Sequence, residues 1–227
     1  MSLSAKLDYN LVSENGILQL IPSDKKKGGA LFVDFAAKSM EYRRNSSGVN
    51  QEIAKAIGCK FGERPSVLDA TAGLGNDAFI LASLGCRVIL VENNPVIYDL
   101  LADGIRRAAD LQDEVGRIVR EKLYLIARQN SVDFLANSSE KFDVIYLDPM
   151  FPDRKKSAKV KKSMQYFQEI VGYDLAQEAQ LLNLALEKSE KRVVVKRRKL
   201  APFLAGKEPN HQIKGKTIRY DIYLQKN

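Results

Sequence analysis

A glycine-containing stretch at residues 65–79, PSVLDATAGLGNDAF, restricts the fold of this chain more than any other segment. A short apolar run at residues 67–68 breaks into small residues and two glycines, and an apolar segment with helical spacing follows from Phe79. This order predicts a strand, a tight turn and a helix. Gly73 and Gly75 permit a backbone with positive φ and let a ligand lie directly on the main chain. The stretch therefore predicts a turn that suits a nucleotide.

An acidic residue after the next apolar run strengthens that interpretation. Glu92 ends residues 88–92 and follows Asp69 at about the 20-residue spacing at which nucleotide-binding α/β units place a carboxylate for ribose hydroxyls. Taken alone, Glu92 is read more simply as a solvated strand end, but the two features at this spacing favour a nucleotide site. The third glycine of the dinucleotide pattern is absent, with Asn76 in its region, and this disfavours a nicotinamide cofactor.

Composition limits the class of protein. The chain has 227 residues, enough to bury a full core, and one α/β domain with an N-terminal elaboration is favoured over two independent domains. Its net charge of +8 favours a polyanionic partner such as nucleic acid. Cys59 and Cys86 are the only cysteines and His211 is the only histidine, so the sequence offers no disulfide framework and no histidine-based metal site.

Targeting signals are not evident. The N-terminus lacks a basic segment followed by an apolar one, and the chain has no apolar run of about 18 residues. We therefore expect a cytoplasmic protein with no membrane partner.

The N-terminal region, residues 1–62, is predicted to be a small α/β extension that packs on the domain over residues 63–227. Alternating apolar positions on both sides of Asn15-Gly16 indicate a hairpin. Further elements are expected as a strand over residues 31–35, a helix over 36–42 and a helix capped by Asn50 that runs to Ile57 and stops at Gly58.

From Pro65 onward, predicted strands and helices alternate, which indicates a parallel sheet with right-handed crossovers. The third strand, over residues 123–127, leads into Asn130 and Ser131. Carboxyl ends of parallel strands conventionally meet a ligand, so these two side chains are candidates to bind an adenine. An N-cap for the helix over residues 132–136 is an equally good interpretation and is compatible with the first.

A second chemical motif follows the fourth strand, over residues 142–147. It reads Asp148-Pro149-Met150-Phe151-Pro152. A carboxylate and a main-chain carbonyl that each accept a hydrogen bond from an exocyclic NH₂ direct its lone pair towards a methyl donor, and an aromatic ring offers a face for base stacking. Asp148, the carbonyl of Pro149 and Phe151 fit these three roles. The alternative is an ordinary Asp-Pro turn.

Basic residues follow this motif, where phosphates that flank a target base would lie. Such a run is more commonly a solvated face, but its position favours an RNA contact. The fifth strand is expected over residues 192–196; it ends at Lys196, and Arg197 follows it. The predicted RNA-binding residues are Arg154, Lys155, Lys156, Lys159, Lys161, Lys162, Lys196 and Arg197.

Two resemblances give these motifs a specific meaning. Residues 69–75, DATAGLG, resemble the first motif of S-adenosylmethionine-dependent methyltransferases, and residues 148–151 resemble the Asp/Asn-Pro-Pro-Tyr/Phe motif of amino-methyltransferases, with Met150 replacing the second proline. Together with the basic run and residues 192–197, RVVVKR, they resemble the bacterial RsmJ family over about residues 29–224. Those enzymes are 16S ribosomal RNA guanine-N2 methyltransferases.

The resemblance implies a Rossmann-like α/β methyltransferase fold with a mostly parallel seven-stranded sheet and an antiparallel C-terminal hairpin. It implies S-adenosyl-L-methionine as cofactor and 16S ribosomal RNA or the small ribosomal subunit as partner. From the composition above we expect no metal. Asn76 and Asn93 stand where many members carry arginine. With the residues argued above, the predicted cofactor contacts are Asp69, Gly73, Gly75, Asn76, Asp77, Glu92, Asn93, Asn130, Ser131 and Asp148.

Three other functions fit parts of the sequence. The chemistry at Asp148 serves any exocyclic amine, so an adenine-N6 methyltransferase is the first alternative. A catalytically silent RNA-binding protein that retains the cofactor pocket is the second, and intact Asp148 and Glu92 argue against it. A dehydrogenase is disfavoured by the missing glycine and by the lack of an evident acid/base histidine. The sequence leaves the oligomeric state and the exact target nucleotide open.

Overall fold

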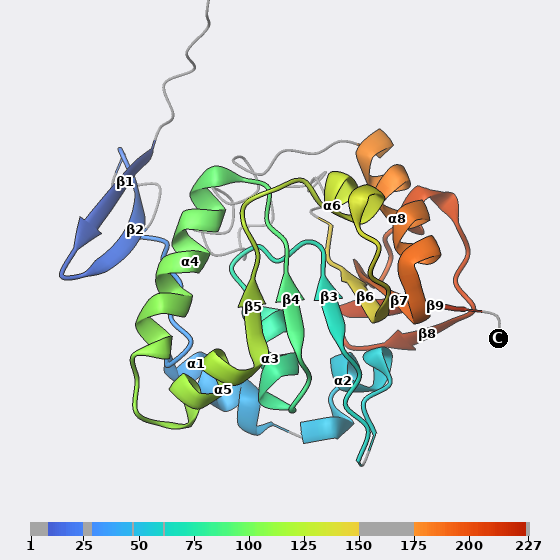
Figure 1. Ribbon diagram of the computed structural model, residues 1–227, viewed down its shortest axis with the longest axis horizontal. Coiled ribbons are helices and arrows are strands. Elements are labelled where there is room, and N and C mark those ends of the chain that lie inside the picture. The colour runs from blue at the N-terminus through green and yellow to red at the C-terminus, as the bar shows by residue number, and fades with distance from the viewer. Residues whose placement is uncertain (1–8, 25–28, 47, 61, 150–174, 226–227) are drawn as a thin grey trace, which may run out of the picture.

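A seven-stranded sheet forms the centre of the computed structural model, which describes residues 9–24, 29–46, 48–60, 62–149 and 175–225 (Figure 1). Its strands are β3 (Val67–Asp69), β4 (Val88–Leu90), β5 (Leu123–Leu125), β6 (Phe142–Leu147), β7 (Ser189–Arg198), β8 (His211–Lys214) and β9 (Ile218–Leu224). They are ordered β5-β4-β3-β6-β7-β9-β8. Strands β5, β4, β3, β6 and β7 run parallel, and β9 is antiparallel to both β7 and β8. The predicted fold is confirmed.

Strand β3 lies between β4 and β6, so the chain leaves it first towards one edge of the sheet and later returns on its other side. The loops that follow β3 and β6 therefore leave the carboxyl ends of these strands in different directions. Such a switch point is where open α/β sheets bind ligands.

Helices cover both faces of this sheet (Figure 1). Those that follow β3 in the chain are α3 (Asn76–Ser83), α4 (Pro95–Ala109), α5 (Glu114–Lys122), α6 (Ser131–Asn137) and α8 (Leu175–Lys188), with a 3₁₀ turn at η3 (Leu204–Gly206). Alternate side chains of a strand point to opposite faces. On β6, Tyr146 faces the core that contains α3 and α4, whereas Ile145 and Leu147 face the core that contains α6 and α8. This alternation decides which polar side chains can meet at the ligand edge.

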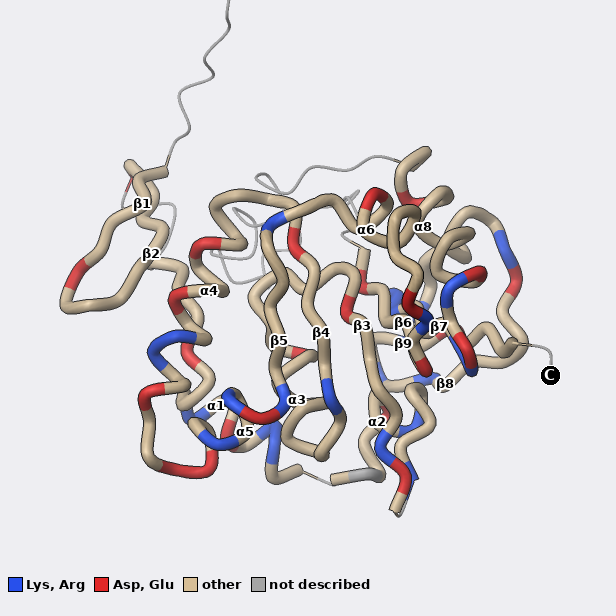
Figure 2. Tube along the Cα trace, viewed as in Figure 1, with Lys and Arg blue, Asp and Glu red and all other residues tan. Residues whose placement is uncertain are grey.

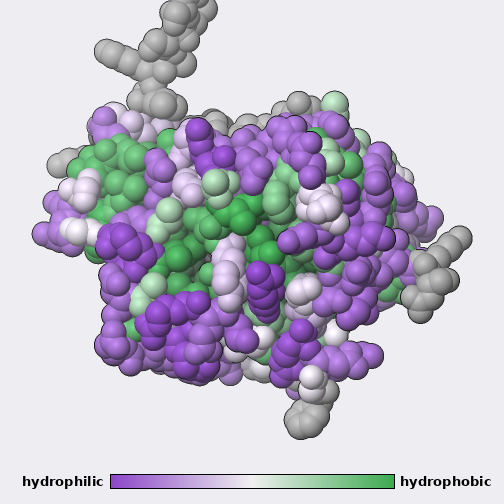
Figure 3. Space-filling model, in the orientation of Figure 1, coloured by the Kyte–Doolittle hydropathy of each residue, from purple (hydrophilic) through white to green (hydrophobic). Residues whose placement is uncertain are grey.

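The N-terminal region begins with the predicted hairpin, β1 (Tyr9–Glu14) and β2 (Ile17–Pro22). Asn15 and Gly16 both have positive φ, as a tight hairpin turn requires. The hairpin rests on α4, where the main-chain N–H of Leu18 donates to Asp103 at 3.1 Å. Strand β1 is largely exposed, Leu11 and Val12 included. Figure 3 shows apolar surface over this part of the molecule.

The rest of this region comprises α1 (Lys38–Asn45), η2 (Gly48–Asn50) and α2 (Glu52–Ile57). Its buried side chains, among them Phe35 and Ile53, belong to the same core as α3 and α4. Helix α2 ends at Gly58 in the left-handed conformation, as predicted. The division into residues 1–62 and 63–227 stays a prediction.

Two local predictions were wrong. Residues 31–35 form no strand; only Leu31 pairs, through an isolated bridge to Leu20. Val33 and Phe35 alternate inward because this extended segment covers the core, and side-chain alternation does not require a ladder of hydrogen bonds. Asn50 does not cap α2, because it lies in η2 and Gln51 occupies the cap position.

Helix α5 has no counterpart among the predicted elements. It begins after Asp113, whose carboxylate accepts a hydrogen bond from the N–H of Gly116 at 3.0 Å. Within the described ranges, no helix is both long and apolar enough to cross a bilayer.

Candidate active site

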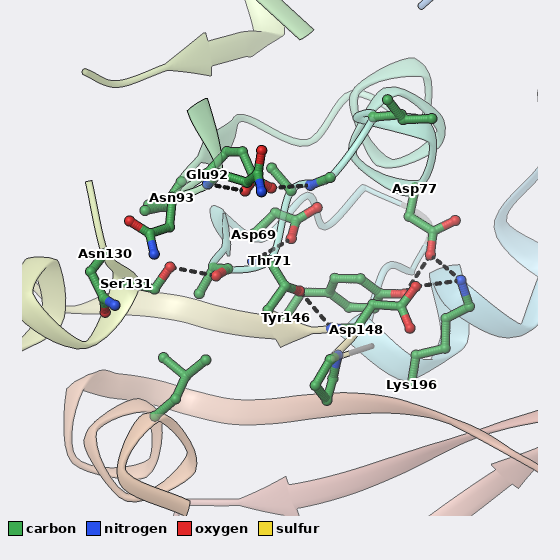
Figure 4. A pocket seen from close by; sticks show the side chains of 18 of the residues that line it. Asp69, Thr71, Asp77, Glu92, Asn93, Asn130, Ser131, Tyr146, Asp148 and Lys196 are labelled. Carbon is green, nitrogen blue, oxygen red and sulfur yellow. Dashed lines mark hydrogen bonds and ion pairs between the residues drawn. The ribbon is translucent and has the colours of Figure 1, made fainter. Parts of the chain in front are cut away.

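A cavity of about 720 Å³ opens where the carboxyl ends of β3, β4, β5 and β6 meet. The loops after these strands supply most of its lining. Arg43 of α1, Lys196 of β7 and part of α8, at Gln177, Glu178 and Leu181, supply the rest. The predicted cofactor residues that line the cavity are Asp69, Gly73, Asn76, Asp77, Glu92, Asn93, Asn130, Ser131 and Asp148. Figure 4 shows how those that it labels surround the space. Four strands thus bring together nearly all of the predicted set.

The two glycines of the first motif have different surroundings. Both adopt positive φ, 54° at Gly73 and 73° at Gly75. Gly73 lines the cavity, but Gly75 does not. A Cβ on Gly75 would lie 2.7 Å from Leu101 Cδ1 and 3.2 Å from the Phe35 ring, so this glycine permits α3 to pack closely on the core. At Gly75 the small residue is therefore required by close packing and not by an opening onto the cavity.

Glu92 connects the loops after β3 and β4. Its Oε2 accepts a hydrogen bond from the N–H of Gly73 at 2.9 Å, and its Oε1 accepts one from the N–H of Asn94 at 2.7 Å. Burial raises the pKa of Glu92, and these main-chain donors partly offset that rise. Each carboxylate oxygen can accept more than one hydrogen bond, so Glu92 retains capacity for ribose hydroxyls.

Asp69, at the end of β3, is 2% exposed and accepts a hydrogen bond from the N–H of Thr71 at 3.1 Å. Burial raises its pKa to about 8, and the nearby carboxylates of Asp77, Asp148 and Glu92 add to the rise. A carboxyl group with this environment favours a positively charged ligand group nearby, because such a charge would stabilise its ionised form.

Asn130 and Ser131 are fixed by local hydrogen bonds. The Asn130 side chain accepts from the N–H of Val132 at 2.8 Å and caps α6, so the N-cap interpretation is confirmed. The Ser131 hydroxyl donates to the carbonyl of Ala70 at 2.5 Å, which ties α6 to the loop after β3. Both residues still line the cavity, so the cap and a contact with adenine are compatible.

Asp77 receives donors from three distant elements, and Figure 4 shows two of them, Tyr146 and Lys196. The Tyr146 hydroxyl donates to its Oδ2 at 2.6 Å, Lys196 Nζ lies 2.8 Å from the same oxygen, and Arg43 forms an ion pair with Oδ1. Burial alone would raise the pKa of Asp77, but the charges of Lys196 and Arg43 hold it well below its usual range. Asp77 is therefore ionised, and it is held in place from three sides.

Asp148 lies at the edge of the same cluster. Its N–H donates to the hydroxyl of Thr71 at 2.6 Å, and its Oδ2 lies 2.8 Å from Lys196 Nζ. The side chain is 39% exposed, whereas that of Asp77 is 10% exposed. The main chain of Asp148 is thus anchored by Thr71, and its carboxylate contacts Lys196 and remains accessible to a substrate.

Sequence reasoning missed Arg43, Thr71 and Tyr146, and it placed Lys196 among RNA contacts. The signal for Tyr146 was its position two residues before Asp148, because alternate residues of a strand share a face. Arg43 carried no comparable signal. It reaches the cavity from α1, and only the packing of α1 against α3 brings it there.

The predicted RNA-binding residues fall into two groups. Lys196 is 21% exposed and contacts two carboxylates, while Arg197 is 3% exposed and donates to the carbonyl of Pro202. Neither side chain is largely exposed, and their RNA contacts stay predictions. The other predicted residues lie outside the described ranges, as does the catalytic candidate Phe151. They are Arg154, Lys155, Lys156, Lys159, Lys161 and Lys162.

Charged residues elsewhere are mixed in sign. Figure 2 shows basic and acidic residues interspersed along the described chain on this face of the molecule. In the same part of the chain, no three His, Cys, Asp or Glu side chains are grouped so as to hold a metal ion. The cavity thus offers ion pairs, at Arg43–Asp77 and Lys196–Asp148, and no grouped metal ligands among the residues described.

The sheet order, the helices on both faces and the cavity at the switch point define an S-adenosylmethionine-dependent methyltransferase of the Rossmann-like class. A family model described as putative SAM-dependent methyltransferase matches residues 1–225. Relatives named ribosomal RNA small subunit methyltransferase J include one from Shewanella amazonensis, 46% identical over 96% of this chain and 87% of the relative. Another, from Aeromonas hydrophila, is 48% identical over 95% of this chain and 86% of its own. This chain belongs to their family.

A solved structure supports the same assignment. A SAM-dependent methyltransferase from Neisseria gonorrhoeae superimposes with a TM-score of 0.76 at 35% identity, covering 99% of this chain and 86% of that one. The resemblance to this family is confirmed, and the cofactor of the family is S-adenosyl-L-methionine.

Proposed function

We propose that the protein transfers a methyl group from S-adenosylmethionine to N2 of a guanine in 16S ribosomal RNA. The observation that carries this proposal is the position of Asp148, a carboxylate anchored at the edge of the cavity with 39% of its side chain exposed. Relatives at 46 to 48% identity that bear the name ribosomal RNA small subunit methyltransferase J support the substrate class.

The cavity suits the cofactor on chemical grounds. Its volume of about 720 Å³ lies within the range of small-molecule sites. Glu92 offers acceptor oxygens for ribose hydroxyls, and Gly73 presents main chain to the space. Asp77 and Asp69 place carboxyl groups near the region where cationic parts of the cofactor would be bound. When bound, S-adenosylmethionine supplies an electrophilic methyl group on a sulfonium.

Asp148 makes the target amine a better nucleophile. The lone pair of an exocyclic NH₂ on guanine is delocalised into the ring. A carboxylate that accepts a hydrogen bond from this NH₂ localises electron density on the nitrogen. The carbonyl of Pro149, which also lines the cavity, is the second proposed acceptor. These two acceptors orient the amine, and a correctly oriented pair of reactants loses much of its entropic barrier.

The remaining parts of the proposal concern the RNA. Phe151 would stack on the flipped guanine, and the basic residues between positions 154 and 162 would contact the flanking phosphates. The sequence also predicts RNA contacts for Lys196 and Arg197. We further propose that the protein acts in the cytoplasm, on 16S ribosomal RNA or the small ribosomal subunit.

Nucleoside analysis of ribosomal RNA tests the function. Small-subunit RNA is isolated from a deletion strain, and from the same strain complemented with the wild-type gene or with Asp148→Ala. We expect one N2-methylguanosine to disappear on deletion and to return only with the wild-type gene. Loss of N6-methyladenosine instead would support the adenine alternative. An unchanged nucleoside profile would overturn the proposal.

A further inference from the structure

The geometry around Asp148 assigns a role to a side chain outside the proposed reaction. Lys196 Nζ lies 2.8 Å from Asp148 Oδ2 and 2.8 Å from Asp77 Oδ2. We propose that Lys196 is a positioning residue for methyl transfer, which orients the Asp148 carboxylate, opposes its protonation and ties it to the cofactor cavity through Asp77. Burial raises the pKa of Asp148, and the charge of Lys196 works against that rise. This inference rests on the proposed function, in which Asp148 accepts a hydrogen bond from the target amine.

The strand register explains why these groups meet. Tyr146 pairs with Val194 and Leu147 pairs with Val195, so Asp148 comes level with Lys196 just past the paired residues. Val194 and Tyr146 both face the core that contains α3. With a side-chain period of two, Lys196 and Asp148 face the same side, towards Asp77 at the start of α3.

Lys196 is held more firmly than a surface lysine. A surface lysine can point its ammonium freely into water. The side chain of Lys196 is only 21% exposed, and its ammonium contacts two carboxylates. Burial lowers the pKa of Lys196, but the charges of Asp77 and Asp148 more than offset this effect and raise it. The ammonium therefore stays charged, and only one oxygen of Asp148, Oδ2, contacts it.

The charges of the cluster balance. Arg43 and Lys196 supply two positive charges, and Asp77 and Asp148 supply two negative charges. Removing Lys196 would leave two carboxylates near each other with one cation, and like charges disfavour ionisation of both. The charged and titratable groups that face the pair are Arg43 of α1, Asp69 of β3, Asp77 of α3, Tyr146 of β6 and Tyr220 of β9.

The alternative is the role that the sequence predicted, a contact between Lys196 and an RNA phosphate. The two roles differ in what the protein does without RNA. A positioning residue changes the titration of Asp148 in the free protein, whereas a phosphate contact changes the salt dependence of RNA binding.

The test compares Lys196→Met and Lys196→Gln, which remove the charge, with Lys196→Arg, which keeps it. Lys191→Met is the matched control, because Lys191 lies on the same strand and forms a 2.7 Å ion pair with Asp143 at the other end of β6. Circular dichroism establishes that each variant is folded. If Lys196→Met does not fold, Lys196→Gln replaces it in the test, since its amide can still hydrogen-bond to the carboxylates.

The first measurement uses the protein without RNA. Titration of ¹³C-labelled aspartate carboxyl groups by NMR, with Asp148→Asn for assignment, should show the Asp148 pKa rising by about one unit or more in Lys196→Met and Lys196→Gln. It should stay unchanged in Lys191→Met. An unchanged Asp148 pKa in both charge-removing variants would overturn the inference, whatever the protein methylates.

The second measurement is single-turnover methyl transfer across pH with saturating RNA and cofactor. At pH 7 we expect a loss of about 10- to 100-fold in Lys196→Met, the size seen when a supporting residue of a site is removed. The rate should recover partly as the pH rises and Asp148 ionises, and Lys196→Arg should retain more activity. A wild-type rate in Lys196→Met, with a salt slope reduced by about one unit, would assign Lys196 to a phosphate instead. Absence of guanine methylation by the wild-type protein would overturn the proposed function, while the NMR titration would still decide the link between Lys196 and Asp148.

Discussion

Gly73 donates a main-chain hydrogen bond of 2.9 Å to Glu92, so the carboxylate expected to bind ribose also fixes the loop that would carry the rest of the cofactor. A second main-chain donor, from Asn94, occupies the other oxygen at 2.7 Å. One side chain therefore sets the relative position of the loops after β3 and β4.

Glu92→Ala should weaken binding of S-adenosylmethionine by about 1 to 3 kcal/mol, because ribose hydroxyls and two main-chain donors lose their acceptor. Glu92→Gln should also weaken it, since the amide NH₂ would face one of those donors. Calorimetric titration of each variant measures the effect, with exposed Glu140→Ala as the control. Wild-type affinity in Glu92→Ala would remove this residue from the cofactor site.

Asp148→Ala should slow methyl transfer far more than it weakens RNA binding. The lost hydrogen bond matters most as the amine attacks, so it acts on the transition state. Single-turnover rates and RNA affinity, measured on the same preparation, separate the two effects, and exposed Asp133→Ala provides a control. Transfer at the wild-type rate would exclude the proposed role of Asp148.

Asp69→Asn should change how stability depends on pH. The pKa of Asp69 is raised from 3.8 to about 8, so between these values the folded protein binds a proton that the unfolded chain has lost. Stability from this group is fully present below pH 3.8 and is lost as pH rises to about 8, by at most about 1.4 kcal/mol per pH unit.

Urea unfolding at several pH values between 5 and 8 measures this effect. We expect the free energy of unfolding of the wild-type protein to fall relative to that of Asp69→Asn across the interval. Asp34→Asn is the control, because Asp34 is exposed yet accepts a similar main-chain hydrogen bond from Ala36 at 3.0 Å. Parallel curves for wild type and Asp69→Asn would contradict the prediction.

Gly75→Ala should destabilise the protein more than Gly16→Ala. Both glycines have positive φ, near 73° and 76°, so alanine costs about 1 to 2 kcal/mol at each. A Cβ meets nothing within 4 Å at Gly16, but at Gly75 it meets Leu101 and Phe35, which adds about 1 to 3 kcal/mol of overpacking. Urea midpoints with an unchanged slope test the difference, and equal losses would exclude the packing role of Gly75.

The basic run after Phe151 should contribute to RNA affinity without choosing the base. If Lys155→Ala/Lys156→Ala and Lys161→Ala/Lys162→Ala each remove phosphate contacts, the plot of log affinity against log salt flattens by slightly less than one unit per contact. Phe151→Ala should reduce methylation with little change in that slope. If both lysine pairs leave slope and affinity unchanged, the run is a solvated face.

The sequence predicted the cavity better than it predicted the connections within it. Parallel strands end at one edge of a sheet, so locating the strands was enough to bring Asp69, Glu92, Asn130 and Asp148 together. The pattern at Gly73 and Gly75 could not distinguish ligand contact from packing, because that depends on what lies beside each glycine after folding.

Long-range side-chain contacts were not predictable for a similar reason. Lys196 reaches Asp148 only through the register of β6 and β7, and a one-residue slip would turn it to the other face of the sheet. Arg43 reaches Asp77 because α1 packs on α3, and neither helix carries a pattern that names its partner. In residues 31–35, buried and exposed side chains alternate as they do in a strand. This pattern indicates only that one side of the segment is buried, and it does not indicate pairing with another strand.

The convergence of donors on Asp77 has a consequence for the order in which the site is assembled during synthesis. Arg43 and Tyr146 leave the ribosome before Lys196, and Lys196 lies on a strand between β6 and β9. A nascent chain that ends before β7 holds Asp77 without its ammonium partner and lacks the next strand of the sheet. Capacity to bind the cofactor should therefore arise late in translation, only after the chain has emerged past Lys196.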